Sequence, residues 1–162
     1  MHFPHTYPLA MINETQLDNQ LSTLQEQTIN NGGIWRFLQL PIPAQENFED
    51  FLRLQSNTLE LTPLPAEGIK TYLSEKIDSW SSYEGPSPSR RANSDEYERL
   101  RLAFLEDLLH FIESKGLKKV YRVEGLDFWI KTVIPSGTDQ LSEEHIFHTE
   151  NGAYLLHLGF SS

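Results

Sequence analysis

Histidines and carboxylates gather near the end of the chain, in the stretch EEHIFHTENGAYLLHLGF, residues 143–160. Three histidines and three glutamates flank one Asn-Gly pair there. Imidazole and carboxylate groups bind divalent metals, and imidazole exchanges protons near neutral pH. The same stretch also has the pattern of a β-hairpin, because Asn-Gly between apolar residues favours a two-residue turn. A metal site, a catalytic site and an ordinary hairpin are therefore all open.

A turn at Asn151-Gly152 predicts two strands, 145–149 and 153–160. Side chains alternate between the two faces of a strand. One face then collects a set that resembles a core surface, and the other face is more polar. The core set would be His145, Phe147, Thr149, Tyr154, Leu156, Leu158 and Phe160.

On the second face this register makes His148 and His157 diagonal neighbours, close enough for both rings to reach one ion at ~2.1 Å. Glu150 lies on the same face, near the turn, whereas His145 points to the opposite face. The sequence thus offers His148, His157 and Glu150 as ligands for zinc or another divalent metal. A small metal-assisted hydrolase or metal-binding protein is accordingly one alternative function.

Other enzyme signatures are missing from the sequence. It contains no HExxH, GxSxG, Walker A or GxGxxG pattern. It contains no cysteine, which excludes disulfides, thiolate metal sites and cysteine nucleophiles. The balance favours a non-catalytic protein without a cofactor.

A tryptophan among cations is the second candidate site. Residues 117–124 and 126–134 alternate as strands around Glu124-Gly125, which predicts another hairpin. In that hairpin the indole of a tryptophan lies beside three cations. Such an indole could stack on a ligand or anchor a partner. The residues are Trp129, Lys118, Arg122 and Lys131. The alternative is that a helix or loop covers the indole and that the lysine stems pack alongside it.

The net charge is −10, from 23 acidic and 13 basic residues. This charge repels nucleic-acid phosphates and favours a basic protein partner; the alternative is that it serves only solubility. Acidic residues of the first predicted helix and of the segment with Glu46, Glu49 and Asp50 would steer such a partner.

The periodicity of apolar residues predicts helices and strands in an α+β fold, with a mainly antiparallel sheet and helices packed on one face. We expect one domain over residues 1–162, with an irregular N-terminal tail at 1–12 and a mobile, proline-rich loop at 83–93. The expected helices are 13–28, 45–55, 65–82 and 93–115, and the expected strands are 34–40, 58–61, 117–124, 126–134, 145–149 and 153–160.

The absence of cysteine and of a basic, apolar leader favours the cytoplasm, and no apolar run approaches the ~20 residues that a membrane-spanning helix needs. The leading hypothesis is a non-catalytic cytosolic protein-binding module, such as an acidic inhibitor or immunity-type protein for a basic partner. A small-molecule sensor, with a pocket between the sheet and the 83–93 loop, is the third possibility.

Overall fold

The computed structural model describes residues 12–28, 33–41, 48–55, 59–82, 94–124 and 141–160. The predicted strand 126–134 and the predicted loop 83–93 lie outside these residues, as does the predicted tail apart from Ile12. The elements, in chain order, are α2 (Glu14–Glu26), β1 (Gly33–Gln39), α3 (Phe48–Gln55), β2 (Glu60–Leu64), α4 (Ile69–Ser81), α5 (Ser94–Ser114), β3 (Leu117–Glu124), β4 (Leu141–Thr149) and β5 (Gly152–Phe160).

The five strands form one antiparallel sheet in the order β1-β5-β4-β3-β2, which confirms the predicted α+β class. β5 pairs with β4 on one side and with β1 on the other, and all nine of its residues are buried. Because β5 alternates bulky side chains to both faces, it supplies core to each side of the sheet.

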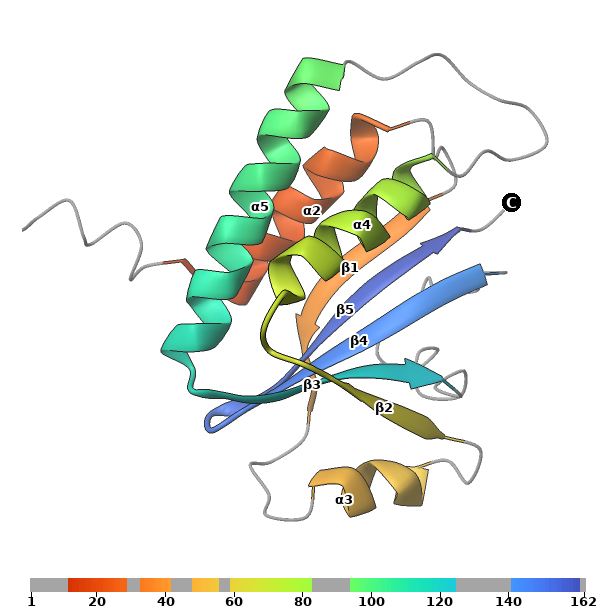
Figure 1. Ribbon diagram of the computed structural model, residues 1–162, viewed down its shortest axis with the longest axis vertical. Coiled ribbons are helices and arrows are strands. Elements are labelled where there is room, and N and C mark those ends of the chain that lie inside the picture. Colours follow the sequence, from red (N-terminus) through yellow and green to blue (C-terminus); the bar gives the residue numbers. More distant parts are fainter. Residues whose placement is uncertain are drawn as a thin grey trace, which may run out of the picture.

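Three helices cover one face of the sheet, as predicted. Figure 1 shows α2, α4 and α5 together on this side. They bury leucines of α2, an Ile-Leu-Ile stripe of α4 and the broad apolar arc of α5 against β1, β4 and β5. The buried helix residues are Leu17, Leu21, Leu24, Ile69, Leu73, Ile77, Phe104, Leu105, Leu108, Phe111 and Ile112.

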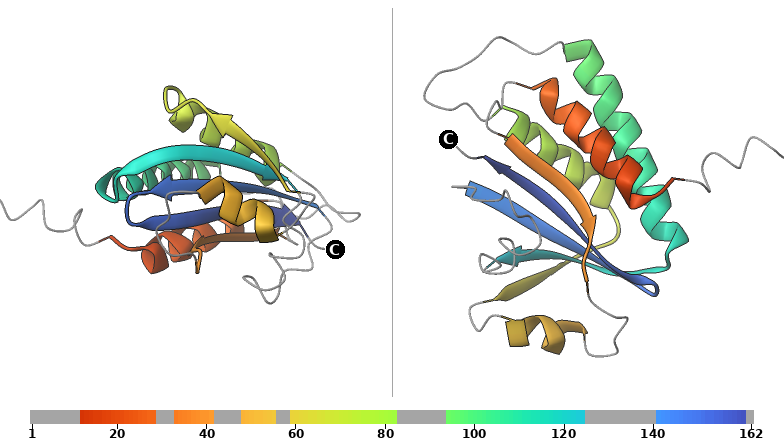
Figure 2. Two further views of the ribbon diagram at one scale, coloured as in Figure 1. Left: turned by 90° about the horizontal axis from the view of Figure 1, so that it is seen from below. Right: turned by 180° about the vertical axis from the view of Figure 1, so that it is seen from behind.

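The short helix α3 packs on the opposite face, away from the other three helices (Figures 1 and 2). Phe48 and Leu52 lie four residues apart, so both point to one side of the helix. They join a second core cluster with Tyr121, Ile146 and Leu155. The helices thus lie on both faces, three on one and α3 on the other.

Local sequence explains where the helices begin and end. Asn13 accepts a hydrogen bond from the backbone N–H of Gln16, whose side chain accepts one from the Asn13 N–H in return, and this capping box starts α2. Gly116 follows α5 with φ +81°, a left-handed conformation that glycine adopts without steric cost.

The partners of β3 differ from the sequence prediction. β2 and β4 pair with the two edges of β3, so Val120 lies opposite Leu64 and Phe147. The predicted hairpin of 117–124 with 126–134 required one of those edges. Both edges of β3 are also occupied at Arg122, which lies opposite Thr62 of β2 and His145 of β4.

Candidate functional site

The C-terminal hairpin forms as predicted, but in a register shifted by two residues. Thr149 lies opposite Gly152, so the two turn residues are Glu150 and Asn151. Both are held by the two residues that follow α5: the Glu150 N–H donates to the Gly116 carbonyl, and the Asn151 side chain donates to the Lys115 carbonyl. These contacts fix the turn one residue earlier than the Asn-Gly pair alone suggests.

The corrected register separates the predicted metal ligands. His148 lies opposite Ala153, and His157 lies opposite Glu144, four residues farther along β5. That places the two histidines on the same face but about 13 Å apart along the strands. Glu150 is an exposed turn residue. Within the part of the chain that the structure describes, no group of three histidine, aspartate or glutamate side chains could hold a metal ion.

His148 takes part in packing. Its ring stacks on Phe48 of α3, with centroids 4.2 Å apart and planes 7° from parallel. Burial, together with the charge of Lys118, lowers the pKa of His148, so the neutral ring is favoured in this stack. His148 thereby helps to hold α3 on its face of the sheet.

His157 forms a buried pair with Glu144. The imidazole Nδ1 lies 2.7 Å from the Glu144 carboxylate, and the two side chains are 0% and 7% exposed. They come from directly opposed positions on β4 and β5. A carboxylate that orients an imidazole is common in catalysis, but it also satisfies a buried polar pair, and burial at this level favours the structural role.

A larger group of polar side chains lies between α4 and the sheet, which we call the α4 polar cluster. It comprises Tyr72, Lys76 and Trp80 of α4, Arg122 of β3, and Glu143 and His145 of β4. The three α4 residues are spaced by four, so they form one stripe beside the apolar stripe of that helix. Glu143 and His145 are two apart on β4 and share a face.

Glu143 is the centre of the cluster. Its carboxylate accepts hydrogen bonds from Trp80 Nε1 at 2.7 Å and Lys76 Nζ at 3.0 Å, and Arg122 lies at 3.3 Å. Burial alone would raise the pKa of Glu143, but these hydrogen bonds and the two cations lower it below its ordinary value. The carboxylate is therefore held ionised and its hydrogen-bonding capacity is largely used.

His145 lies deeper in the same cluster and is fully buried. Its Nε2 is 2.8 Å from the Tyr72 hydroxyl oxygen, whereas its Nδ1 has no hydrogen-bond partner in the described structure. Burial lowers the pKa of His145 to about 4. The ring is accordingly neutral at pH 7, and the pair connects α4 to β4.

In chemical terms this cluster contains a tyrosine and a neutral histidine that can share a proton. A general base must reach the proton that it removes from a substrate. His145 is 0% exposed, so the arrangement favours holding α4 on the sheet over catalysis.

The predicted tryptophan site is only partly within the described residues. Trp129 and Lys131 lie outside them. Lys118 is exposed at a register shift in β3, and Arg122 faces the helical layer, where it pairs with Glu143 and Glu124. Lys118 and Arg122 are four residues apart on one strand, about 13 Å, and the predicted site between them and Trp129 stays a prediction.

The predicted acidic segment maps to α3. Glu49 and Asp50 are in its first turn, half-buried and exposed respectively, and Glu46 lies outside the described residues. Arg53 follows in the last turn, so the described helix has a net charge of −1.

Most of the negative charge lies instead on the three-helix layer. Eleven acidic and four basic residues occupy α2, α4 and α5, a net charge of −7 within the −10 of the chain. Several of these acids make internal contacts: Asp78 and Glu98 pair with buried Arg101, and Asp18 pairs with Arg36. Others, such as Asp95 and Glu113, are exposed.

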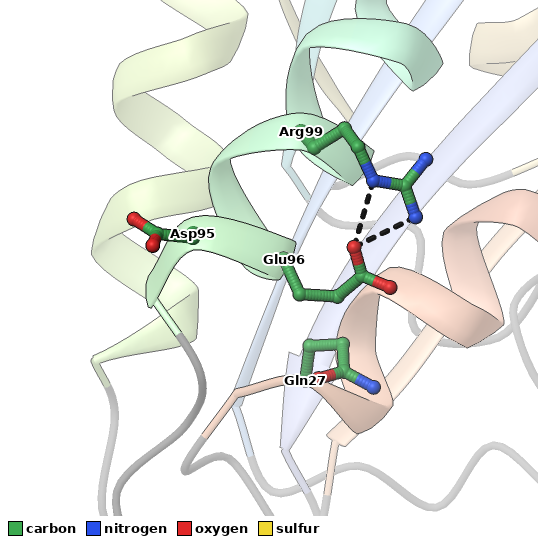
Figure 3. Close-up of a pocket in the computed structure, with 4 residues that line it drawn as sticks. All are labelled: Gln27, Asp95, Glu96 and Arg99. Atoms are coloured by element: carbon green, nitrogen blue, oxygen red, sulfur yellow. Dashed lines mark hydrogen bonds and ion pairs between the residues drawn. The ribbon is translucent and has the colours of Figure 1, made fainter.

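A shallow polar depression lies where α5 begins and α2 ends (Figure 3). Its volume is about 510 Å³, and it is lined by Gln27, Asp95, Glu96 and Arg99. Arg99 is already paired with Glu96 at 2.7 Å. The described residues that line it come from α5 and from the end of α2, whereas the predicted sensor pocket involves the 83–93 loop and lies outside the described residues.

Sequence reasoning missed the α4 polar cluster, although one signal was present. Lys76 interrupts the apolar periodicity of α4 between Tyr72 and Trp80. A cation at such an inward position requires a carboxylate partner. The partner is Glu143, 67 residues away in sequence, which local patterns do not identify.

Comparison of the chain with protein-family models and with curated proteins finds no match. Within the described ranges, no helix has both the length and the apolar character to cross a bilayer.

Proposed function

We propose that this protein is a non-catalytic, cytoplasmic protein-binding module that recognises a basic protein partner, in the manner of an inhibitor or immunity-type protein. The observation that carries the proposal is the net charge of −7 on one three-helix layer. A surface with a net negative charge accelerates encounter with a partner of the opposite charge.

The exposed side of α5 presents three carboxylates in one line, of which Glu106 also pairs with Lys70 of α4. Asp95, Leu102, Glu106 and Glu113 are exposed and follow one another at intervals of seven, four and seven residues. At 3.6 residues per turn these intervals return to the same side of the helix. Leu102, 43% exposed, lies inside the line and supplies apolar contact area among the carboxylates.

Glu46, Glu49 and Asp50 remain part of the proposal as a second, weaker acidic region. The described part, in α3, lies on the other side of the sheet from α5 (Figure 1). The two regions can therefore be tested separately with variants of equal charge.

The experiment is a pull-down from the native cell with the tagged full-length protein, at low and at high salt, with bound proteins identified by mass spectrometry. The α5 variant Asp95→Asn/Glu106→Gln/Glu113→Gln and the α3-side variant Glu46→Gln/Glu49→Gln/Asp50→Asn serve as parallel baits. Each variant removes three negative charges.

The proposal predicts one basic protein, recovered stoichiometrically at low salt, released at high salt and recovered less by the α5 variant. The α3-side variant should weaken recovery to a smaller extent. Recovery of a partner that is insensitive to salt and equal for all three baits would contradict the proposal. So would the absence of any specific partner.

A further inference from the structure

Helix α4 is joined to the rest of the fold by two kinds of contact. Its apolar stripe enters the core, and its polar stripe meets β4 through Tyr72, Lys76 and Trp80. Figure 1 shows α4 lying over the sheet on the same side as α5. Near its C-terminal end Asp78 bonds to Arg101 and Tyr97 of α5, which ties the two helices together independently of β4.

Among the residues that meet the polar stripe of α4, His145 has a buried ring nitrogen without a hydrogen-bond partner. It is 0% exposed, Nε2 is used by the Tyr72 hydroxyl, and Nδ1 has no partner among the described residues. With Nε2 protonated and Nδ1 bare, the ring is neutral and one acceptor atom is left without a partner. A second proton would place an N–H donor and a full charge where the described residues provide no acceptor, which is costly.

The charges around His145 act in both directions, and burial is the largest cause of its lowered pKa. Lys76 of α4 and Arg122 of β3 are the cations that disfavour its protonation, and Glu143 of β4 is the carboxylate that favours it. Glu143 already accepts from Trp80 and Lys76 and lies beside Arg122. On β5 the residue opposite His145 is Leu156, which offers no acceptor side chain. The lowered pKa of His145 agrees with this geometry.

We propose that α4 is an acid-sensitive latch: proton uptake by His145 loosens α4 from β4 while the rest of the helical layer stays in place. The orphan Nδ1 can gain a hydrogen-bond partner only when water reaches it, and this requires displacement of Tyr72 and the helix that carries it. This inference is independent of the proposed partner and can fail or hold separately from it.

The other helices are secured by contacts that do not involve His145. Asp18 of α2 accepts from the Phe37 N–H on the edge of β1 and pairs with Arg36. Gln20 of α2 donates to Asp107 of α5 at 2.8 Å. Helix α2 is therefore an internal reference for opening that is specific to α4.

The test is amide hydrogen exchange of the full chain between about pH 7 and 5, with protection factors corrected for the intrinsic pH dependence of exchange. The opened state takes up the proton first, so protection of α4 should fall by up to about tenfold per pH unit below pH ~6. Protection of α2 should fall much less. Parallel loss of protection in α4 and α2 across this range would overturn the proposal.

His145→Phe keeps a buried ring without a titrating group, and the half-buried Tyr72 hydroxyl can turn to water. The His145→Phe substitution should abolish the extra pH dependence of the amide protection of α4. The matched control is His148→Gln, on the same strand but the opposite face, which should retain that dependence. A His145→Phe variant with the wild-type response, or a His148→Gln variant without it, would contradict the latch.

Tyr72→Phe provides a second route should His145→Phe fail to fold. It removes only the hydroxyl that meets Nε2 at 2.8 Å. Protection of α4 should then be lower than wild type at neutral pH, with α2 unchanged. Wild-type protection of α4 in this variant would overturn the assignment of Tyr72 and His145 as the latch.

Discussion

Glu144 of β4 and His157 of β5 lie directly opposite each other, and the carboxylate Oε2 is 2.7 Å from the imidazole Nδ1. Both side chains are buried near the middle of the sheet, on the face opposite the three-helix layer. Replacing only one member of such a pair leaves the other with an unsatisfied buried group.

Glu144→Ala should lower the free energy of unfolding by about 3 kcal/mol, because the His157 Nδ1 then has no carboxylate partner. Glu144→Gln keeps an oxygen that can accept from the imidazole and should cost about 1 kcal/mol. Urea denaturation at pH 7 measures both. Equal and small costs for the two variants would show that the pair contributes little to the fold.

The pH dependence of stability should carry the signature of His145. Its pKa falls from 6.5 to about 4 on folding, so the unfolded chain binds the proton first as the pH decreases. The stability that comes from keeping the ring neutral is complete above pH ~6.5 and is lost as the pH falls toward ~4, by up to about 3 kcal/mol.

Urea denaturation of wild type and His145→Phe between about pH 7 and 4 tests this. Acids distant from His145 titrate alike in both proteins, so the difference in unfolding free energy reports on His145 and its immediate neighbours. Wild type should lose stability relative to the variant across that range. A difference that does not change with pH would contradict the buried, neutral histidine.

Gly116 and Gly68 offer a matched pair for separating backbone strain from side-chain contact. Both have φ near +80°, but a Cβ on Gly116 would approach the Glu150 carboxyl carbon to 3.0 Å, whereas a Cβ on Gly68 meets nothing within 4 Å. Gly68→Ala should cost about 1 kcal/mol from the left-handed backbone alone, and Gly116→Ala should cost more.

A double-mutant cycle checks the cause. In a Glu150→Ala background the cost of Gly116→Ala should fall toward that of Gly68→Ala, since the contact is then removed and only the backbone cost remains. If Glu150→Ala leaves the cost of Gly116→Ala unchanged, the contact is not the reason for it.

Much of the fold could be predicted from local pattern. The apolar arc of α5 and the glycine after it predicted the end of that helix to within one residue. The predicted strand 117–124 matches β3. These elements depend on short-range periodicity and termination signals, which the sequence carries directly. The helical layer on one face and the antiparallel sheet follow from the order of such elements.

The register of the last hairpin could not be predicted in the same way. Asn151-Gly152 is a favourable turn pair, but tertiary contacts of Glu150 and Asn151 with the end of α5 move the turn by one residue. One residue in the turn moves the cross-strand pairs by two, which keeps the faces and changes the partners. The predicted diagonal pair of His148 and His157 does not form because of this change of register.

The α4 polar cluster was beyond prediction for a different reason. Tyr72 and His145 are 73 residues apart, and their contact depends on how α4 crosses the sheet. Periodicity places each residue on a face of its own element, but it does not determine which faces of distant elements meet.

Zinc binding should not depend on His148 and His157 together, since the sheet holds them about 13 Å apart. Wild type and His148→Ala are both purified without a metal-affinity column. Addition of zinc should change the melting temperature of the two proteins by the same amount. Elemental analysis completes the test. Stoichiometric zinc that is lost in both His148→Ala and His157→Ala would contradict the register of β4 and β5.

The measurement that tests the proposed function most directly is the association rate with the captured partner, by stopped flow at low and high ionic strength. At low salt the wild type should associate about tenfold faster than the Asp95→Asn/Glu106→Gln/Glu113→Gln variant, and the two rates should converge at high salt. The control Glu46→Gln/Glu49→Gln/Asp50→Asn should fall between them. Association rates that do not respond to salt or to loss of the α5 carboxylates would contradict recognition of a basic partner by the acidic helical layer.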